Sequence, residues 1–210
     1  NINIYMEEIQ DIFKSRNTIL SLLSKQNFNV TNQSDTGFNE VNSMYKAKQL
    51  DMLLENNNNN KKVYVKYHLG KSLRPSNIYD YIDDLFTIDN VLKLEDTLII
   101  IMKDEPNDSI KKILKQLFMK DKTFIIIFNI KRLLFNVLEH SLVPPHRVLT
   151  PEEANLIKQK YFVKNDDELP NIDRFSPVSQ AIGIRPGELC EITRNSNTSI
   201  ESKFYRICSN

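Results

Sequence analysis

The spacing of apolar residues at the amino end of the chain predicts two helices. Apolar side chains recur at helical spacing over residues 5–23, and Asn27 is expected to end this helix because Asn tolerates a left-handed backbone. A weaker helical pattern covers about 40–55. Five consecutive asparagines at 56–60 then form a low-complexity insert, which we expect to be a flexible loop.

Two further helices are expected to separate short apolar strands. One should begin at Pro75 and the other after an N-cap at Asn107 or Asp108, and each would bury one face. Strands that are apolar on both faces and alternate with helices favour a small α/β layer with a mainly parallel sheet. The three apolar runs of strand length are 63–67, 97–102 and 123–128.

A domain boundary is expected between about residues 129 and 138, which divides the chain into 1–135 and 136–210. The composition there changes from Asn, Lys and Ile to Pro and Glu, and 133–138 suggests a further strand. Beyond it, Thr150 to Glu153 predicts a capped helix that runs to about Tyr161. A second, short helix should begin at Ser176-Pro177 and end at Gly183. The segments 188–194 and 203–208 predict antiparallel strands joined by a polar loop, so this half is expected to be an α+β module.

Composition narrows the possible functions. The chain has 210 residues, 40% apolar and 26% charged, with a net charge of +1, which is typical of a soluble globular protein. Residues 1–138 carry 19 basic and 17 acidic side chains, and 139–210 carry 9 and 10, so neither half resembles a basic nucleic-acid-binding arm. The apolar runs are too short to span a bilayer, and two cysteines without a disulfide framework fit a reducing compartment.

Candidate catalytic and metal chemistry is sparse. A zinc site from His140, His146, Cys190 and Cys208 would lack any C-x-x-C pair, so two packed histidines and two buried thiols are the better interpretation. With four glycines and no phosphate-cradling loop, no cofactor is expected. Arg16 interrupts the apolar stripe of the first helix and is interpreted as a paired structural arginine.

The small α/β layer resembles the core of restriction-type nucleases. Such an enzyme needs an acid two positions before a lysine on a strand, to hold a divalent metal. Lys66 has Tyr64 at that position and Lys103 has Ile101, so nuclease activity is not expected.

A basic cluster in the first half has two possible roles. Its members either contact phosphates or form a solvated loop edge, and the residues alone favour the loop edge. The cluster contains Lys61, Lys62, Lys66, Lys71 and Arg74.

Residues 139–208 carry an ordered string of distinctive residues that resembles a known family. The resemblance is to the assembly domain of subunit 5 of eukaryotic nuclear RNA polymerases, a domain that also makes up the whole of the corresponding, shorter subunit of archaeal RNA polymerase. The string contains Glu139, His140, Leu142, Val143, Pro144, His146, Leu149, Thr150, Glu153, Leu169, Pro170, Ile172, Pro177, Val178, Ile182, Gly183, Ile184, Gly187, Arg194, Ser196, Thr198, Tyr205 and Arg206.

The resemblance has departures as well as matches. Arg16 and Thr18 are similar to residues of the family's jaw domain, whereas Asn27 stands where the family usually has Gly. In the assembly domain, Ser176 replaces an Asp, and Ile200 replaces the Gly of a loop that includes Thr198. Ser and Asp are both good N-caps, so the helix start should persist.

The resemblance implies a non-catalytic subunit of DNA-dependent RNA polymerase. Its jaw (1–135) would have a restriction-endonuclease-like scaffold without a catalytic site and lie by downstream duplex DNA, with weak, non-specific contact. Its assembly domain (136–210) would dock on the largest subunit. No membrane and no small-molecule substrate are expected as partners. The alternative is a free transcription adaptor or a degenerate nuclease-like DNA-binding protein.

The expected subunit-interface residues lie in the assembly domain and the expected DNA-proximal residues in the jaw. The location would be the nucleus for a cellular protein, or the virion and host cytoplasm for a virus-encoded one, and the Asn, Ile and Lys bias suggests a large DNA virus or an AT-rich protist. The interface candidates are His140, Pro144, His146, Pro177, Gly183, Arg185, Gly187, Arg194, Tyr205 and Arg206. The DNA-proximal candidates are Lys61, Lys62, Lys71 and Arg74.

Overall fold

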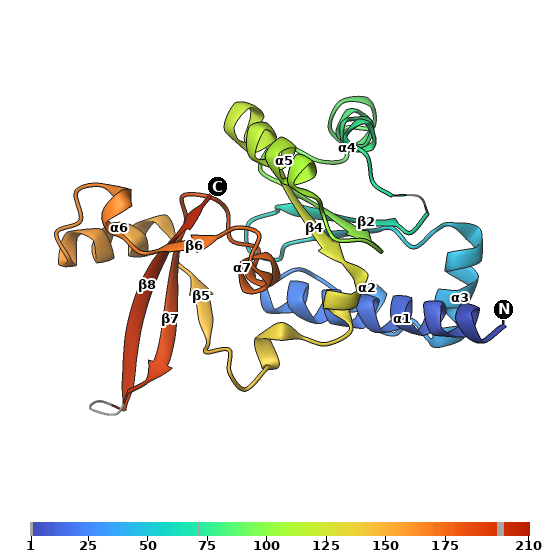
Figure 1. Ribbon diagram of the computed structural model, residues 1–210, viewed down its shortest axis with the longest axis horizontal. Coiled ribbons are helices and arrows are strands. Elements are labelled where there is room, and N and C mark those ends of the chain that lie inside the picture. Colours follow the sequence, from blue (N-terminus) through green and yellow to red (C-terminus); the bar gives the residue numbers. More distant parts are fainter. Residues whose placement is uncertain (1, 71, 197–199) are drawn as a thin grey trace. The chain divides into compact units, whose positions relative to one another are not determined.

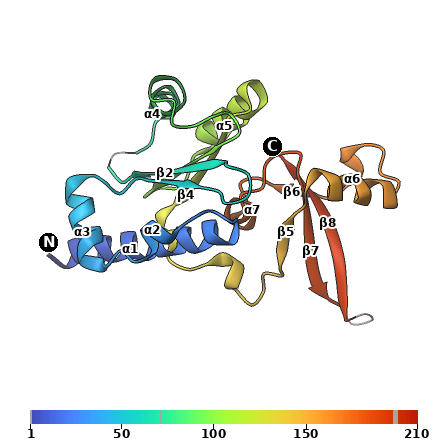
Figure 2. The ribbon, with the colours of Figure 1, turned by 180° about the vertical axis from the view of Figure 1, so that it is seen from behind.

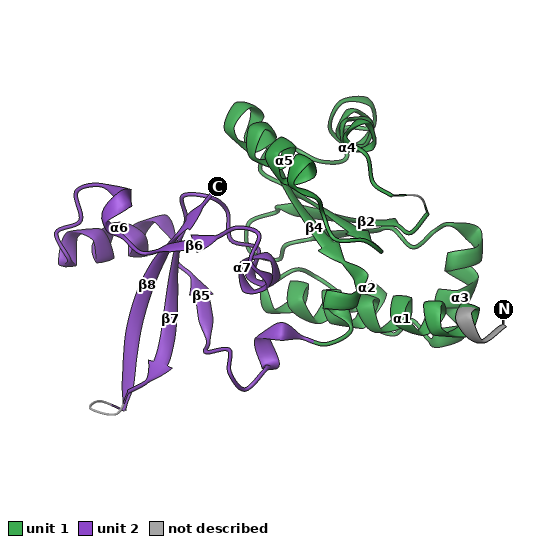
Figure 3. Cartoon of the chain, in the orientation of Figure 1, with its two compact units in different colours: residues 1–135 green, residues 136–210 purple. Residues whose placement is uncertain are grey.

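The chain forms two compact units, each built around a four-stranded mixed sheet. The computed structural model describes residues 2–70, 72–196 and 200–210. Unit 1 is Asn1–Phe135 and unit 2 is Asn136–Asn210 (Figure 3). Both units mix helices with strands, so the α/β and α+β content expected from the sequence is found.

The sheet of unit 1 has the strand order β1-β2-β3-β4. β1 (Met52–Glu55) pairs antiparallel with β2 (Lys62–His68), whereas β2, β3 (Thr97–Met102) and β4 (Phe124–Asn129) are parallel to one another. Every residue of β4 and all but the first residue of β3 are buried, as expected for strands that are covered on both faces.

Helices cover both faces of this sheet (Figures 1 and 2). The long first helix lies against one face, and α4 and α5 lie against the other. α4 continues directly into a π-helical segment, Asp83–Ile88. The helices are α1 (Ile2–Lys25), α2 (Thr31–Ser34), α3 (Phe38–Ala47), α4 (Pro75–Ile82) and α5 (Asp108–Asp121).

Local sequence signals explain where the helices of unit 1 begin and end. Asn27 adopts a φ of 67°, so the predicted end of the first helix is confirmed. The side chain of Asn107 accepts a hydrogen bond from the Ile110 amide at 2.9 Å, which confirms the predicted N-cap. Of the described residues, none belongs to a helix long and apolar enough to cross a membrane.

Three sequence-based expectations are wrong or incomplete. The helix expected over 40–55 ends at Ala47, because Lys48 takes a left-handed backbone, and strand β1 follows. The strand expected over 133–138 is instead part of two 3₁₀ turns, Ile130–Leu133 and Val137–Glu139, each begun by an Asn side chain that accepts a backbone N–H. The asparagine segment is anchored, since Asn56 is buried and forms a β-bridge with Phe28.

The sheet of unit 2 has the strand order β5-β7-β8-β6. β7 (Leu189–Asn195) and β8 (Glu201–Ser209) form the predicted antiparallel pair. The outer strands β5 (His146–Val148) and β6 (Asn171–Asp173) have three residues each and were not expected from the sequence. β5 runs antiparallel to β7, and β6 runs parallel to β8.

The two helices of unit 2 pack on opposite faces of its sheet. α6 (Pro151–Lys160) begins with the predicted capping box of Thr150 and Glu153, and its apolar residues pack on Leu189 and Ile207. α7 (Pro177–Ile182) begins at the Ser176 cap, and its Ile182 packs in a second core cluster. That second cluster contains Ile172, Ile184, Cys190, Ile192 and Cys208.

Candidate functional site

The α7 face of the unit 2 sheet brings together three of the residues predicted to lie at an interface. Paired residues of adjacent strands share a face, and His146 pairs with Ile192 of β7, which pairs with Phe204 of β8. Arg206 is two residues beyond Phe204 in the same strand and therefore lies on the same face. The Arg194 guanidinium lies over the Phe204 ring, 5.1 Å from its centroid. This face therefore carries a cationic and aromatic row at its edge.

The surroundings of His146 lower the pKa of its imidazole. Burial lowers the pKa of its imidazole, and the charges of Arg194 and Arg206 lower it further, although the contact with the Pro144 carbonyl acts in the opposite direction. Its Nδ1 lies 2.6 Å from that carbonyl oxygen, so in the neutral ring Nδ1 carries the proton and donates it. The bond fixes the ring beside the proline-rich segment.

A shallow pocket of about 370 Å³ joins the proline-rich segment to the end of β7. Pro144 and Arg194 both line it, as does Leu142, which is 84% exposed. His140 precedes this segment, is exposed, and accepts a hydrogen bond from the Leu142 amide at 3.2 Å. An exposed leucine beside a rigid proline turn is a suitable anchor for another protein.

The glycines and prolines around α7 have local structural roles. Gly183 ends the helix with a φ of 67°. Gly187 has a φ of 89° in a turn in which the Glu188 amide bonds back to the Arg185 carbonyl at 3.0 Å. Pro177 is exposed at the first turn of α7. These residues shape a rigid surface whether or not a partner contacts it.

Tyr205 lies on the opposite face from Arg206 because the two are neighbours in one strand. Its hydroxyl donates to the Glu191 carboxylate at 3.3 Å, and its ring lies 5.8 Å from that of Tyr161, just past α6. The Arg206 guanidinium reaches the Asn171 carbonyl at 3.3 Å. The predicted interface residues are therefore divided between two faces of unit 2.

Sequence reasoning missed a buried carboxylate and an apolar patch on the α6 side. Glu191 is 8% exposed and is held by Lys203 at 3.2 Å and Arg147 at 3.4 Å. Burial raises the Glu191 pKa, but the contacts with these two cations outweigh burial and leave the pKa below its ordinary value. Tyr161, whose ring lies beside that of Tyr205, and Phe162 follow α6, and Phe162 is 86% exposed at a φ of 56°. The sequence did contain a signal for Glu191, because a charged residue stands there between apolar residues of a predicted strand.

The two cysteines lie in the core of unit 2. Both Cys190 and Cys208 are buried free thiols in the cluster under α7. Burial raises the pKa of Cys190 to about 11 and that of Cys208 to about 12. Thiols held protonated in an apolar cluster are poorly suited to bind metal as thiolates. In the described part of the chain, no group of three or more potential metal ligands is found.

The basic residues predicted to be DNA-proximal do not form one cluster. Lys61 and Lys62 lie at the start of β2, and Lys62 pairs with Glu55 at 3.1 Å. Arg74 lies beyond the other end of the strand, as the N-cap residue of α4. A seven-residue strand spans roughly 20 Å, so the two groups are well separated. Lys71 lies outside the described residues.

Arg16 is buried, with 2% of its surface exposed. Among the described residues, no carboxylate forms a hydrogen bond with its guanidinium. Its Nη1 donates to the Leu50 carbonyl at 3.2 Å and its Nη2 to the Gln33 side chain, while its Nε has no hydrogen-bond partner. Burial lowers its pKa. The expected structural role is thus served by neutral acceptors rather than by an ion pair.

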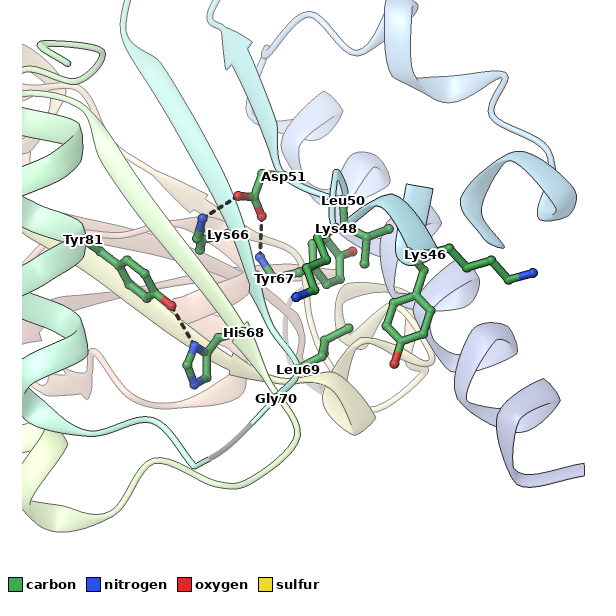
Figure 4. Close-up of a pocket in the computed structure, with 11 residues that line it drawn as sticks. Lys46, Lys48, Leu50, Asp51, Lys66, Tyr67, His68, Leu69, Gly70 and Tyr81 are labelled. Atoms are coloured by element: carbon green, nitrogen blue, oxygen red, sulfur yellow. Dashed lines mark hydrogen bonds and ion pairs between the residues drawn. The ribbon is translucent and has the colours of Figure 1, made fainter. Parts of the chain in front are cut away.

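A larger pocket, of about 710 Å³, opens at the carboxyl end of β2 in unit 1 (Figure 4). We call it the β2 pocket; it is lined by Tyr45, Lys46, Lys48, Leu50, Asp51, Lys66, Tyr67, His68, Leu69, Gly70 and Tyr81. Its residues come from the end of α3, the segment before β1, the end of β2 and α4. No pattern along the chain indicates this pocket, because β1 was not predicted.

Asp51 is the central polar residue of the β2 pocket. Its carboxylate accepts from Lys66 Nζ at 2.7 Å, from the Tyr67 amide at 3.0 Å and from the Tyr64 hydroxyl at 3.3 Å. The antiparallel register, with Met52 opposite Val65, places Asp51 beside Lys66. Although burial lowers the Lys66 pKa, the hydrogen bond and charge of Asp51 outweigh burial, so the pKa is raised.

This arrangement is poorly suited to hydrolytic metal chemistry. Tyr64 occupies the position where a nuclease would need an acid, and it donates to Asp51 rather than adding a second carboxylate. Three donors already occupy the Asp51 oxygens. A divalent cation prefers several oxygen ligands, and here Lys66 takes the place that the cation would need.

Comparison with known proteins gives a match over residues 135–208 to the family described as RNA polymerase Rpb5, C-terminal domain. Over nearly the whole chain, the protein is 26% identical in 204 residues to the DNA-directed RNA polymerases I, II, and III subunit rpabc1 of Dictyostelium discoideum, covering 97% of this chain and 100% of that protein. It is 44% identical over 73 residues to subunit Rpo5 of Methanothrix thermoacetophila and 38% identical over 73 residues to that of Pyrococcus abyssi. Each of these two matches covers 35% of this chain. The match covers 92% of the Methanothrix thermoacetophila protein and 88% of the Pyrococcus abyssi protein.

Proposed function

The chain belongs to the Rpb5/Rpo5 family of DNA-directed RNA polymerase subunits, and we propose that it is a non-catalytic subunit of a DNA-dependent RNA polymerase. The observation that carries the proposal is the end-to-end match to a subunit of the polymerases of Dictyostelium discoideum. The Asp51 carboxylate supports the non-catalytic role, since three protein donors already bond to it and none of the three contacts brings a second carboxylate.

Unit 2 is the polymerase-docking part in this proposal, and its partner is the largest subunit. The family match at 135–208 coincides with unit 2, and the 73-residue matches to archaeal subunits have nearly the same length. Exposed apolar side chains at Leu142 and Phe162 support docking, because an anchor that leaves water gains the most from burial. The proline turns before β5 add rigidity, which lowers the entropy cost of association.

Unit 1 is the jaw in this proposal, on a restriction-endonuclease-like scaffold, and it lies by downstream duplex DNA. The separation of Lys62 from Arg74 along β2 supports weak, non-specific contact, since these basic residues do not form one compact patch that could bind neighbouring phosphates together. The subunit would act in the nucleus of a cellular host, or in virions and host cytoplasm if it is virus-encoded.

Purification of the native complex tests the proposal. The tagged full-length chain should recover the largest polymerase subunit at equal stoichiometry and retain it in high salt, because apolar contacts are not screened. If no polymerase is recovered, the protein is not a polymerase subunit. A phosphodiesterase assay of the isolated chain with Mg²⁺ or Mn²⁺ should show no turnover, and activity lost on Asp51→Asn would contradict the non-catalytic role.

A further inference from the structure

We propose that the β2 pocket binds a nucleotide through its phosphate. The inference rests on the residues of unit 1 and does not depend on polymerase membership. The nucleotide can be free in solution or part of a nucleic-acid strand, because both present the same phosphate chemistry beside a planar base.

The charge of the pocket lining favours an anion. Lys46, Lys48 and Lys66 contribute three positive charges and Asp51 one negative charge, which gives a balance of +2 for the lysine and aspartate side chains. The ion pair of Asp51 with Lys66 neutralises the single acid. The Lys48 ammonium group therefore remains uncompensated over the pocket, with Lys46 at its rim, and phosphate is the common biological anion that such groups bind.

Lys46 and Lys48 are available to a ligand. Within the described part of the chain, neither forms an ion pair, whereas Lys62, Lys66 and Lys103 each do. Lys48 caps α3 with a left-handed backbone at a φ of 57°. Its side chain extends over the pocket in the direction of Leu69, whereas the Lys46 side chain starts at the rim and points away from the other lining residues (Figure 4).

The position of the pocket in the fold agrees with this assignment. It opens where β2 ends, and β2 is parallel to β3 and β4. Ligands of open α/β sheets characteristically bind outside the carboxyl ends of parallel strands. A pocket of about 710 Å³ with tyrosine and histidine in its walls is large enough for a base as well as a phosphate.

The buried Arg16 adds a fixed positive charge beneath the same site. Its Nη1 donates to the carbonyl of Leu50, and Leu50 itself lines the pocket. No carboxylate hydrogen-bonds to this guanidinium among the described residues, and its Nε has no partner. Glu40 acts on this guanidinium electrostatically, so Arg16 adds a partly compensated positive charge next to the pocket lining.

Nearby acids indicate where in the pocket the phosphate lies. Glu8 bonds to the Tyr45 hydroxyl at 2.7 Å but is paired with Lys103 at 2.8 Å. Asp80 and Asp84 act electrostatically on Tyr81, at the α4 side of the pocket. The phosphate is therefore expected at the Lys48 side, with the base toward Tyr81.

The test uses the full-length chain and amide NMR titrations with adenosine monophosphate, adenosine, inorganic phosphate and a short single-stranded oligonucleotide. The variant Lys46→Gln/Lys48→Asn removes the charges of the two lysines that form no ion pair. Asn is chosen at position 48 because it tolerates the left-handed backbone of that residue. Its control is Lys120→Gln/Lys122→Asn, which removes the same charge at the same spacing from the end of α5, where Lys122 also caps the helix with a φ of 56°.

The expected result is that adenosine monophosphate shifts the amide signals of Lys48 and of His68 to Gly70. Binding should weaken about tenfold in the pocket variant, as for loss of a charge-assisted contact, and remain unchanged in the control. Tighter binding of the oligonucleotide at the same residues would identify a nucleic-acid strand as the source. Equal binding of adenosine, an equal loss in the control, or no shift with any phosphate-bearing probe would overturn the proposal.

Discussion

Replacement of Asp51 should show how the β2 pocket is held together. Its carboxylate serves two purposes: it pairs with Lys66, and it accepts the Tyr67 amide beyond the last β1–β2 residue pair. Loss of an acceptor from a half-buried amide costs about 1–3 kcal/mol. The Asp51 and Lys66 side chains are 23% and 29% exposed, so solvent screening reduces the ion pair to about 0.5–1 kcal/mol.

These magnitudes predict different costs for different substitutions. Asp51→Ala removes both interactions and should lower the free energy of unfolding of unit 1 by about 2–3 kcal/mol. Asp51→Asn keeps an oxygen for the Tyr67 amide and should cost about 1 kcal/mol, and Lys66→Met, which leaves that amide contact intact, should cost a similar amount. The order of the variants, rather than any single value, identifies the amide contact as the larger contribution.

Amide hydrogen exchange is the suitable assay, because two compact units need not unfold together. The opening free energy of the Tyr67 amide would be compared between wild type and variants. Asp108→Asn is the matched control, since Asp108 is fully exposed and its contact with Lys111 is 3.6 Å long. If Asp51→Asn were as damaging as Asp51→Ala while the control stayed neutral, the reasoning would fail, because charge would then matter more than the amide acceptor.

Three further predictions concern unit 2. Gly187→Ala should lower stability by about 1–2 kcal/mol in thermal unfolding, because φ is 89° and an added Cβ meets no atom within 4 Å, so only backbone strain acts. The cost of Glu191→Gln in urea unfolding should be about 1–2 kcal/mol near neutral pH and shrink as pH falls below 4.5, because the contact with Lys203 keeps the Glu191 pKa below that ordinary value. Phe162→Ser should weaken recovery of the polymerase about tenfold in pull-downs, whereas Met119→Ser, an exposed apolar residue of unit 1, should not.

Features encoded by neighbouring residues were predicted well. Asn107, Thr150 and Ser176 cap helices through side chains that reach only three residues along the chain, so sequence spacing is enough to recognise them. The runs at 97–102 and 123–128 are recognisable because strands buried on both faces are continuously apolar.

Features that depend on distant pairing were missed. β1 has four residues and exists because Met52 to Glu55 pair with β2, which no local spacing reveals. Without β1, nothing placed Asp51 beside Lys66, and the β2 pocket could not be anticipated. The strand expected over 133–138 is wrong for the opposite reason: Asn136 offers a local side-chain acceptor to Leu138, and this turn prevails over an apolar run without a strand partner.

The brevity of the two outer strands in unit 2 leaves part of a longer strand at the border of the sheet. β6 pairs only with Ile207 to Ser209 of β8, and β5 pairs only with Cys190 to Ile192 of β7. Among the described strands, residues 201–206 of β8 are therefore paired on one side alone, and such a border is where sheet proteins can add a further strand. Lys203 and Arg206 lie in this segment, and charged side chains on a border strand oppose the pairing of one copy with the next.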